Sequence, residues 1–199
     1  MSKGDLTRQR IIEQAAPLFN QRGFAGCSMQ DVLEATGLEK GGVYRHFASK
    51  EDLATAVFAW SVERAVKTRT DGVDEAGDAV EKLKAIVRRF VEEPSPIAGG
   101  CPLLNAAVDA DDGNAALRRL VRKAFADWRR RLAARVTEGI AEGVIRRDAD
   151  PDRVADTIVA ALEGGLVLSR LDGNREALRN AEVFLGEMLE RMRPQARRP

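Results

Sequence analysis

The chain has 199 residues, of which 44% are hydrophobic and 32% are charged, and its formal net charge is +1. This composition is typical of a soluble protein built from one medium domain, or from a small domain joined to a larger one. No stretch reaches the roughly 18 consecutive apolar residues of a membrane-spanning helix, and the start MSKGDLTRQR lacks a secretory signal. We therefore expect a cytoplasmic protein with no membrane partner.

The cysteine and histidine content excludes several kinds of site. Cys27 and Cys101 are too few for a disulfide framework, and with the single histidine, His46, they cannot complete a zinc site of four such ligands. A nucleophilic cysteine would need a basic partner, and His46 is far from Cys101 in the sequence. We expect no metal, no cofactor and no enzymatic activity, and we keep a thiol-based redox response of Cys27 and Cys101 as an alternative.

Helical periodicity runs through nearly the whole chain, and period-two alternation is absent. The pattern predicts an all-α protein of about nine helices. The first helix runs from about Asp5 to Arg22, and Gly23 ends it. Pro17 lies inside this helix and should bend it or loosen its hydrogen bonding.

Two short helices follow, joined by a tight turn. Ser28 is the expected N-cap of the first, and Asp31 stands where a negative charge suits the helix dipole. Gly37 supplies a left-handed turn, and the second helix runs from about residue 39 or 40 to Phe47. Two short helices joined by about three residues around a glycine are typical of a helix-turn-helix.

The rest of the chain is expected to form six more helices. Their starts are marked by Ser49, Asp78, the segment CPLLNAAVDA, Asn114, Asp150 followed by Pro151, and Asn174. The segments TDGVDEAG and PSPIAGG are typical of surface loops. We expect a three-helix domain over 1–50, a C-terminal helical domain over 51–193 and a flexible tail over 194–199.

The stretch LEKGGVYRHFASKEDL, residues 38–53, has the character of a DNA-docking surface. The second helix of a helix-turn-helix enters the major groove. Gly41 and Gly42 would let its backbone approach a duplex closely, which would offset the roughly 1 kcal/mol that glycine costs inside a helix. Lys40 adds charge, and Arg45 could make a bidentate contact to guanine.

Flanking polar residues fit contacts with phosphates. Tyr44 and His46 could hydrogen-bond to phosphate oxygens, and Ser28 and Lys50 stand at helix N-termini, where free N–H groups favour phosphate. The alternative is that Tyr44 belongs to the core with Val43 and Phe47, and that His46 is an ordinary surface residue.

The segment SMQDVLEATGLEKGGVYRHFASKEDL, residues 28–53, resembles the DNA-binding signature of the TetR/AcrR family of transcriptional regulators, and AAPLFNQRGFAG resembles the first helix of that family. The resemblance implies contacts with double-stranded operator DNA. Phosphate contacts are implied for Ser28, Tyr44, His46 and Lys50, and base or near-base contacts for Glu39, Lys40, Gly41, Gly42 and Arg45. Glu39 departs from the small hydroxyl residues common there; its carboxylate repels phosphate but can accept from cytosine N4.

The resemblance also implies a C-terminal ligand-binding and dimerisation domain. The last two helices would form a four-helix interface between two copies, and a homodimer would hold two recognition helices roughly 34–36 Å apart on a palindrome. The expected interface residues are Ile158, Leu162, Gly165, Leu166, Ala181, Phe184, Leu185 and Met188. The alternative is that these helices pack only within one protomer.

A small-molecule effector is the second partner that the resemblance implies. The candidate pocket residues, which could also be ordinary core, are Phe58, Trp60, Phe90, Cys101, Leu104, Asn105, Phe125, Trp128 and Glu163. The segments GGCPLLN and ALEGGLVLSR are similar to segments of a TetR branch that includes flavonoid-responsive repressors, which implies an apolar or aromatic effector. The resemblance thus implies a one-component repressor that an effector releases from its operator.

Overall fold

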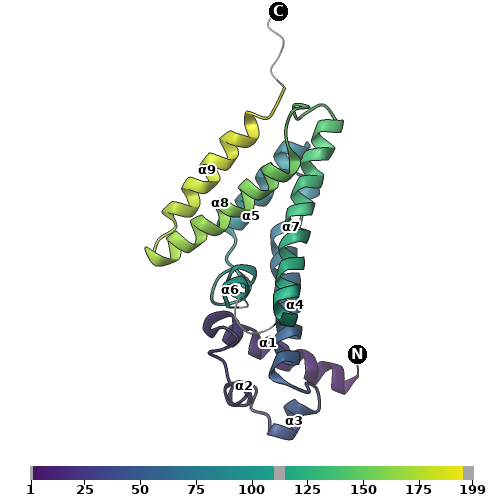
Figure 1. Cartoon of the computed structure of the whole chain (residues 1–199), viewed down its shortest axis with the longest axis vertical. Coiled ribbons are helices and arrows are strands. Elements are labelled where there is room, and N and C mark those ends of the chain that lie inside the picture. The colour runs from purple at the N-terminus through teal and green to yellow at the C-terminus, as the bar shows by residue number, and fades with distance from the viewer. Residues whose placement is uncertain (1, 110–114, 195–199) are drawn as a thin grey trace, which may run out of the picture. The chain divides into compact units, whose positions relative to one another are not determined.

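The computed structural model describes residues 2–109 and 115–194, and every regular element in these ranges is a helix, so the all-α prediction is confirmed (Figure 1). The predicted tail beyond Arg193 and the predicted helix start at Asn114 lie largely outside the described residues. The helices are α1 (Lys3–Arg22), α2 (Met29–Thr36), α3 (Lys40–Tyr44), α4 (Lys50–Thr70), α5 (Ala79–Glu92), α6 (Pro102–Asp109), α7 (Ala115–Ala141), α8 (Pro151–Leu171) and α9 (Glu176–Glu190). Within the described ranges, no helix combines the length and apolar character needed to cross a membrane.

Helix α1 starts earlier than its sequence pattern predicted, because Ser2 caps it. The Ser2 hydroxyl accepts a hydrogen bond from the Asp5 N–H (3.2 Å), and the Asp5 carboxylate accepts one from the Ser2 N–H (2.8 Å). This reciprocal capping satisfies two backbone donors at the helix start. The helix then continues through Pro17 to Arg22 without an interruption.

The helix-turn-helix forms as predicted at its first helix and turn. Ser28 caps α2 in a reciprocal pair with Asp31, and Gly37 adopts the left-handed conformation with φ 63°. Helix α3 is shorter than predicted and ends at Tyr44. After Tyr44 the chain forms a tight turn, in which the Val43 carbonyl accepts hydrogen bonds from the His46 N–H (2.9 Å) and the Phe47 N–H (3.1 Å).

Contact density divides the chain into two compact units. Unit 1 comprises Met1–Val66 with Ser95–Phe125, and unit 2 comprises Lys67–Pro94 with Ala126–Pro199. Helices α4 and α7 contribute to both units. Helix α6 packs against α1 within unit 1. The division into two functional domains at residue 50 stays a prediction.

Unit 1 has a continuous apolar core around the helix-turn-helix. Ile11 and Ile12 from α1 pack there with Val32 from α2. Val43 and Phe47 are fully buried in the same core, as their spacing predicted. This core fixes α3 with its opposite face outward.

Unit 2 is built around the mutual packing of α5, α8 and α9, and Figure 1 shows α8 and α9 as an antiparallel pair. A Cβ on Gly165 would lie 3.2 Å from the Ala177 carbonyl oxygen, so this glycine lets α8 and α9 approach closely. Asp150 caps α8 as predicted. Helix α9 begins at Glu176 with Arg175 at the N-cap, although the predicted cap Asn174 does accept a hydrogen bond from the Glu176 N–H (2.8 Å).

One segment predicted as a surface loop contains regular structure. Residues Val73–Glu75 of TDGVDEAG form a 3₁₀ turn, and Val73 is buried. A 3₁₀ turn of three residues is too short to show a helical period in the sequence. The loop-forming residues on both sides therefore led to the prediction of a loop.

Candidate nucleic-acid interface

The nine residues predicted to contact DNA lie together at the surface of unit 1. They come from the α2 N-cap, helix α3 and its following turn, and the first residue of α4. Gly42, His46 and Lys50 are half-buried and the others are exposed; Tyr44 has 39% of its surface accessible. The structure therefore places Tyr44 outside the core, against the alternative that the sequence left open.

The glycine pair on α3 has no structural explanation inside the protein. A Cβ on Gly41 would meet no atom within 4 Å, and one on Gly42 would make an ordinary 3.5 Å contact with Leu38. Neither glycine has a positive φ. Because neither packing nor backbone conformation requires glycine here, the pair leaves room for something outside the chain.

Three cationic side chains, Lys40, Arg45 and Lys50, belong to α3, the turn after it and the start of α4. The Lys40 ammonium lies 5.7 Å from the centre of the Tyr44 ring, and the Lys50 ammonium lies 4.2 Å from the centre of the Phe24 ring. Among the described residues, no hydrogen bond or ion pair engages the Arg45 guanidinium. Glu39 is the N-cap of α3, but its side chain makes no capping hydrogen bond. The surface thus presents three cations and one acid beside an open backbone.

Ser28 is less available to a phosphate than its position suggested. Its hydroxyl donates to the Asp31 carboxylate (2.5 Å), and its N–H donates to the same oxygen (2.7 Å). These two hydrogen bonds, followed by a weaker contribution from Arg22, hold the pKa of Asp31 below its usual value. Both donors of Ser28 are therefore engaged within the protein, and its main role in this structure is to cap α2.

The effector-pocket residues fall in both compact units, and six of them belong to unit 1. Phe58 and Asn105 line a cavity of about 40 Å³ among α1, α4, α6 and the start of α7. Phe125 joins the apolar cluster around Phe58, whereas Trp60 packs against the helix-turn-helix core. Cys101 is buried and Leu104 is half-buried.

The other three pocket candidates belong to unit 2. The rings of Phe90 and Trp128 stack with their centres 5.9 Å apart, and Arg69 lies 4.0 Å from the centre of the Phe90 ring. Glu163 is buried in α8. Each of these side chains already has close neighbours within its own unit.

Four of the predicted dimer-interface residues lie inside the protomer. Ile158, Leu162, Gly165 and Leu185 are buried between α8, α9 and their neighbours. Leu166, Ala181 and Met188 are half-buried, and Phe184 is 57% exposed.

The outward apolar face of α8 and α9 includes residues that the sequence analysis did not select. Val167, Leu168 and Leu171 are exposed on α8, and Val183 is exposed beside Phe184 on α9. With Gly164, whose Cβ position is open, the α8 residues follow the spacing i, i+3, i+4, i+7. The inward-facing apolar residues of α8 recur with the same helical period. The sequence pattern therefore did not show which of the two sets faces outward.

The thiols and the acidic residues give no alternative site. Cys27 and Cys101 are both buried, and burial raises the pKa of the Cys27 thiol. A raised pKa and low exposure disfavour the reactive thiolate, so the redox alternative has no support. In the described parts of the chain, no group of three or more His, Cys, Asp or Glu side chains is placed to hold a metal ion.

Two family models match the chain. The model described as bacterial regulatory proteins of the tetR family matches residues 11–57, which contain the helix-turn-helix. The model described as the tetracyclin repressor-like C-terminal domain matches residues 79–185, more than half of the chain.

Known proteins match over nearly the whole length. A crystal structure of a TetR transcriptional regulator from Chloroflexus aurantiacus is 40% identical, covers 98% of this chain and all of that one, and superposes with a TM-score of 0.92. A TetR-family regulator from Cytophaga hutchinsonii is 32% identical over 98% and 99% of the two chains, also with a TM-score of 0.92. The transcriptional repressor DhaR of Mycobacterium sp. is 28% identical over 94% of this chain and 92% of its own. With its helix-turn-helix and both family domains matched, the chain belongs to the TetR family of transcriptional regulators.

Proposed function

We propose that this protein is a homodimeric repressor that binds a palindromic operator and is released by a small, largely apolar effector. The observation that carries the proposal is the exposed glycine pair of α3, which no contact inside the protein requires and which cations flank. The similarity of the chain to the repressor DhaR supports repression rather than activation. Such a protein would act in the cytoplasm, where the chromosome lies.

On this proposal, α3 enters the major groove, and residues of α3, of the turn after it and of the start of α4 contact the duplex. Gly41 and Gly42 bring the backbone close to the duplex, and Arg45 reads a guanine. Tyr44, His46 and Lys50 bind phosphates, which positions the protein without reading sequence. Because Ser28 and the Asp31 N–H are engaged in the cap, the N–H groups of Met29 and Gln30 would replace the Ser28 hydroxyl as phosphate donors.

The outward apolar face of α8 and α9 supports dimerisation. Leu168, Leu171, Val183 and Phe184 each leave more than half of their surface exposed. Large apolar side chains exposed together on two packed helices favour an interaction site. Phe184 and Met188 also border a groove of about 420 Å³ within unit 2, which could receive side chains of a second copy.

The effector site is proposed around the cavity that Phe58 and Asn105 line. Its volume of about 40 Å³ is far below the roughly 300–1,000 Å³ of sites that hold drug-sized ligands. An effector must therefore widen the cavity, and it shifts the protein only by its greater affinity for the widened conformer. We propose that α4 is displaced in this conformer, so that the two α3 helices of the dimer no longer match the spacing of the operator half-sites.

Selection of duplexes from a random-sequence pool tests the proposal. The wild-type protein should enrich a palindrome, Lys50→Ala should weaken binding on every duplex and flatten its salt dependence, and Arg45→Ala should relax preference at one base position. Failure to enrich any sequence would overturn the proposed function. Equal effects of both variants, independent of salt, would contradict the assignment of their contacts.

A further inference from the structure

Lys50 has a partner that fixes its position at the DNA-facing surface. Its ammonium lies 4.2 Å from the centre of the Phe24 ring, in cation–π geometry. Phe24 lies in the turn between α1 and α2, and its ring stacks on Phe19 with the ring centres 6.5 Å apart. The location of the Lys50 charge therefore depends on the location of the Phe24 ring.

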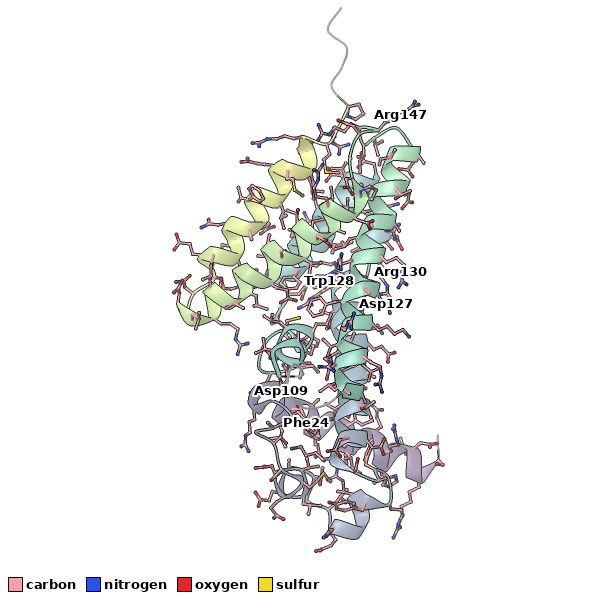
Figure 2. The ribbon with its side chains drawn as sticks, viewed as in Figure 1. Phe24, Asp109, Asp127, Trp128, Arg130 and Arg147 are labelled. Atoms are coloured by element: carbon pink, nitrogen blue, oxygen red, sulfur yellow. The ribbon has the colours of Figure 1, made fainter. Side chains whose placement is uncertain are left out.

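Phe24 is held in turn by Asp109, the last residue of α6. The Phe24 N–H donates a hydrogen bond to the Asp109 carboxylate, and Figure 2 shows the two residues side by side within unit 1. Gly23 makes this contact possible. A Cβ at position 23 would lie 2.8 Å from one Asp109 oxygen, and the φ of 73° at Gly23 also favours glycine.

Asp109 is one of two anchors on the same face of α6. Asn105, one helical turn earlier, donates from its amide nitrogen to the Asn20 carbonyl (2.9 Å) and to the Gly99 carbonyl (2.8 Å). Asn20 itself donates to the Ala98 carbonyl (2.9 Å). Because Asn105 fixes α6 against the end of α1, the carboxylate of Asp109 is held at a set place beside the turn.

We infer that Asp109 is a positioning residue for operator binding: through the Phe24 N–H it sets the ring that carries Lys50, and so places the Lys50 ammonium for its phosphate contact. This inference rests on the proposed function, in which Lys50 binds a phosphate. Asp109 does not touch DNA in this arrangement, since its carboxylate is turned to the Phe24 backbone and an anion would be repelled by the duplex.

A double-mutant cycle on the duplex that the wild-type protein selects tests the inference. Lys50→Ala and Asp109→Ala should each weaken binding by roughly five-fold, because each loses the same phosphate contact. For the same reason, both variants should lower the salt slope, which is the change of log affinity with log salt concentration, to the same extent. The combined variant should be no weaker than Lys50→Ala alone. Asp109→Asn keeps an acceptor oxygen and should bind within about two-fold of the wild type.

The outcomes separate the inference from the proposal beneath it. If Lys50→Ala leaves affinity and salt slope unchanged, the proposed phosphate contact is wrong and the inference falls with it. If Lys50→Ala weakens binding but Asp109→Ala adds an independent, salt-insensitive loss, only the inference is overturned. A loss for Asp109→Asn as large as for Asp109→Ala would also overturn it.

A second variant covers the case in which Asp109→Ala does not fold. Phe24→Leu keeps the backbone N–H that Asp109 binds but removes the aromatic face below Lys50. It should lower the salt slope of binding as Lys50→Ala does. Phe19→Leu is the matched control, because it removes the ring stacked on Phe24 but no cation lies over it among the described contacts; an equal change of slope in both variants would overturn the role of Phe24.

Discussion

Gly41 is the residue at which the fold and the proposed DNA contact favour different side chains. Its Cβ position is open and its φ is not positive, so alanine fits there and favours the helix by up to about 1 kcal/mol. Gly41→Ala should therefore leave the thermal midpoint unchanged or raise it. On the selected duplex its affinity should fall by roughly ten-fold, equivalent to about 1.4 kcal/mol, because the methyl group holds the backbone away from the DNA.

Gly37 provides the control for that substitution. It has a φ of 63° with nothing within 4 Å of its Cβ position. Gly37→Ala should lower the free energy of unfolding by about 1 kcal/mol, through backbone strain alone. A Gly41→Ala protein that is destabilised like Gly37→Ala, or that binds DNA like the wild type, would show that the glycine pair serves the fold.

At the scale of single residues, the sequence predicted what depends on local patterns. Ser28, Gly37 and Asp150 take their capping and turn roles as expected, since each role is set by a few neighbouring residues. The contact of Phe24 with Asp109 was not predicted, because the two residues are 85 positions apart and neither belongs to a motif. The sequence analysis also did not predict that the N–H and the hydroxyl of Ser28 both donate hydrogen bonds to the Asp31 carboxylate.

Among the helices, α5 and α9 are joined by a charged cluster around Arg193. Its guanidinium donates to Asp78 at 2.7 Å and to Glu81 and Glu190 at 3.0 Å. Asp78 also caps α5, and its hydrogen bond with Arg193 is the largest cause that holds its pKa below the usual value. The cluster therefore ties the start of α5 to the end of α9.

Arg193→Met should lower the free energy of unfolding by about 1 kcal/mol near neutral pH. A lowered folded pKa means that the stabilisation is present above the usual Asp78 value of 3.8 and is lost as the pH falls through the folded pKa. The difference between variant and wild type should thus shrink below about pH 4. Urea unfolding across this pH range measures it.

Arg191→Met is the control for this prediction. Arg191 pairs only with Glu187 on α9, at 2.9 Å, among the described residues. Its loss should change the free energy of unfolding by about 0.5 kcal/mol or less. A pH-independent effect of Arg193→Met, or one no larger than that of Arg191→Met, would show that the cluster does not join α5 to α9.

The helices themselves were predictable where a cap and a long apolar period coincide, as in α2, α5 and α8. Helix boundaries that depend on tertiary contacts could not be predicted from the sequence. Helix α3 ends at Tyr44, where the His46 N–H bonds only three residues back, to the Val43 carbonyl, and the apolar period of Val43 and Phe47 gave no sign of this turn. The apolar faces of α8 and α9 were recognised, but periodicity does not tell an inward stripe from an outward one, so Ile158 and Leu185 were assigned to an interface although they are core.

For the whole molecule, the proposal requires that two copies meet through the outward apolar face of α8 and α9. Leu168 is 54% exposed at the centre of the α8 stripe. Leu168→Glu would place a charge in the proposed interface, where it has no partner and loses its hydration. The variant should sediment as a folded monomer and bind the selected duplex far more weakly, since each protomer would bind a single half-site.

Leu6→Glu is the matched control, because Leu6 lies on α1 and is 56% exposed, almost the same as Leu168. Both substitutions remove one exposed leucine and add one negative charge, so neither should unfold the protomer. Sedimentation velocity should separate them: Leu6→Glu stays dimeric and Leu168→Glu does not. A dimeric Leu168→Glu protein would place the interface elsewhere, and the half-site spacing would then have to come from another pair of helices.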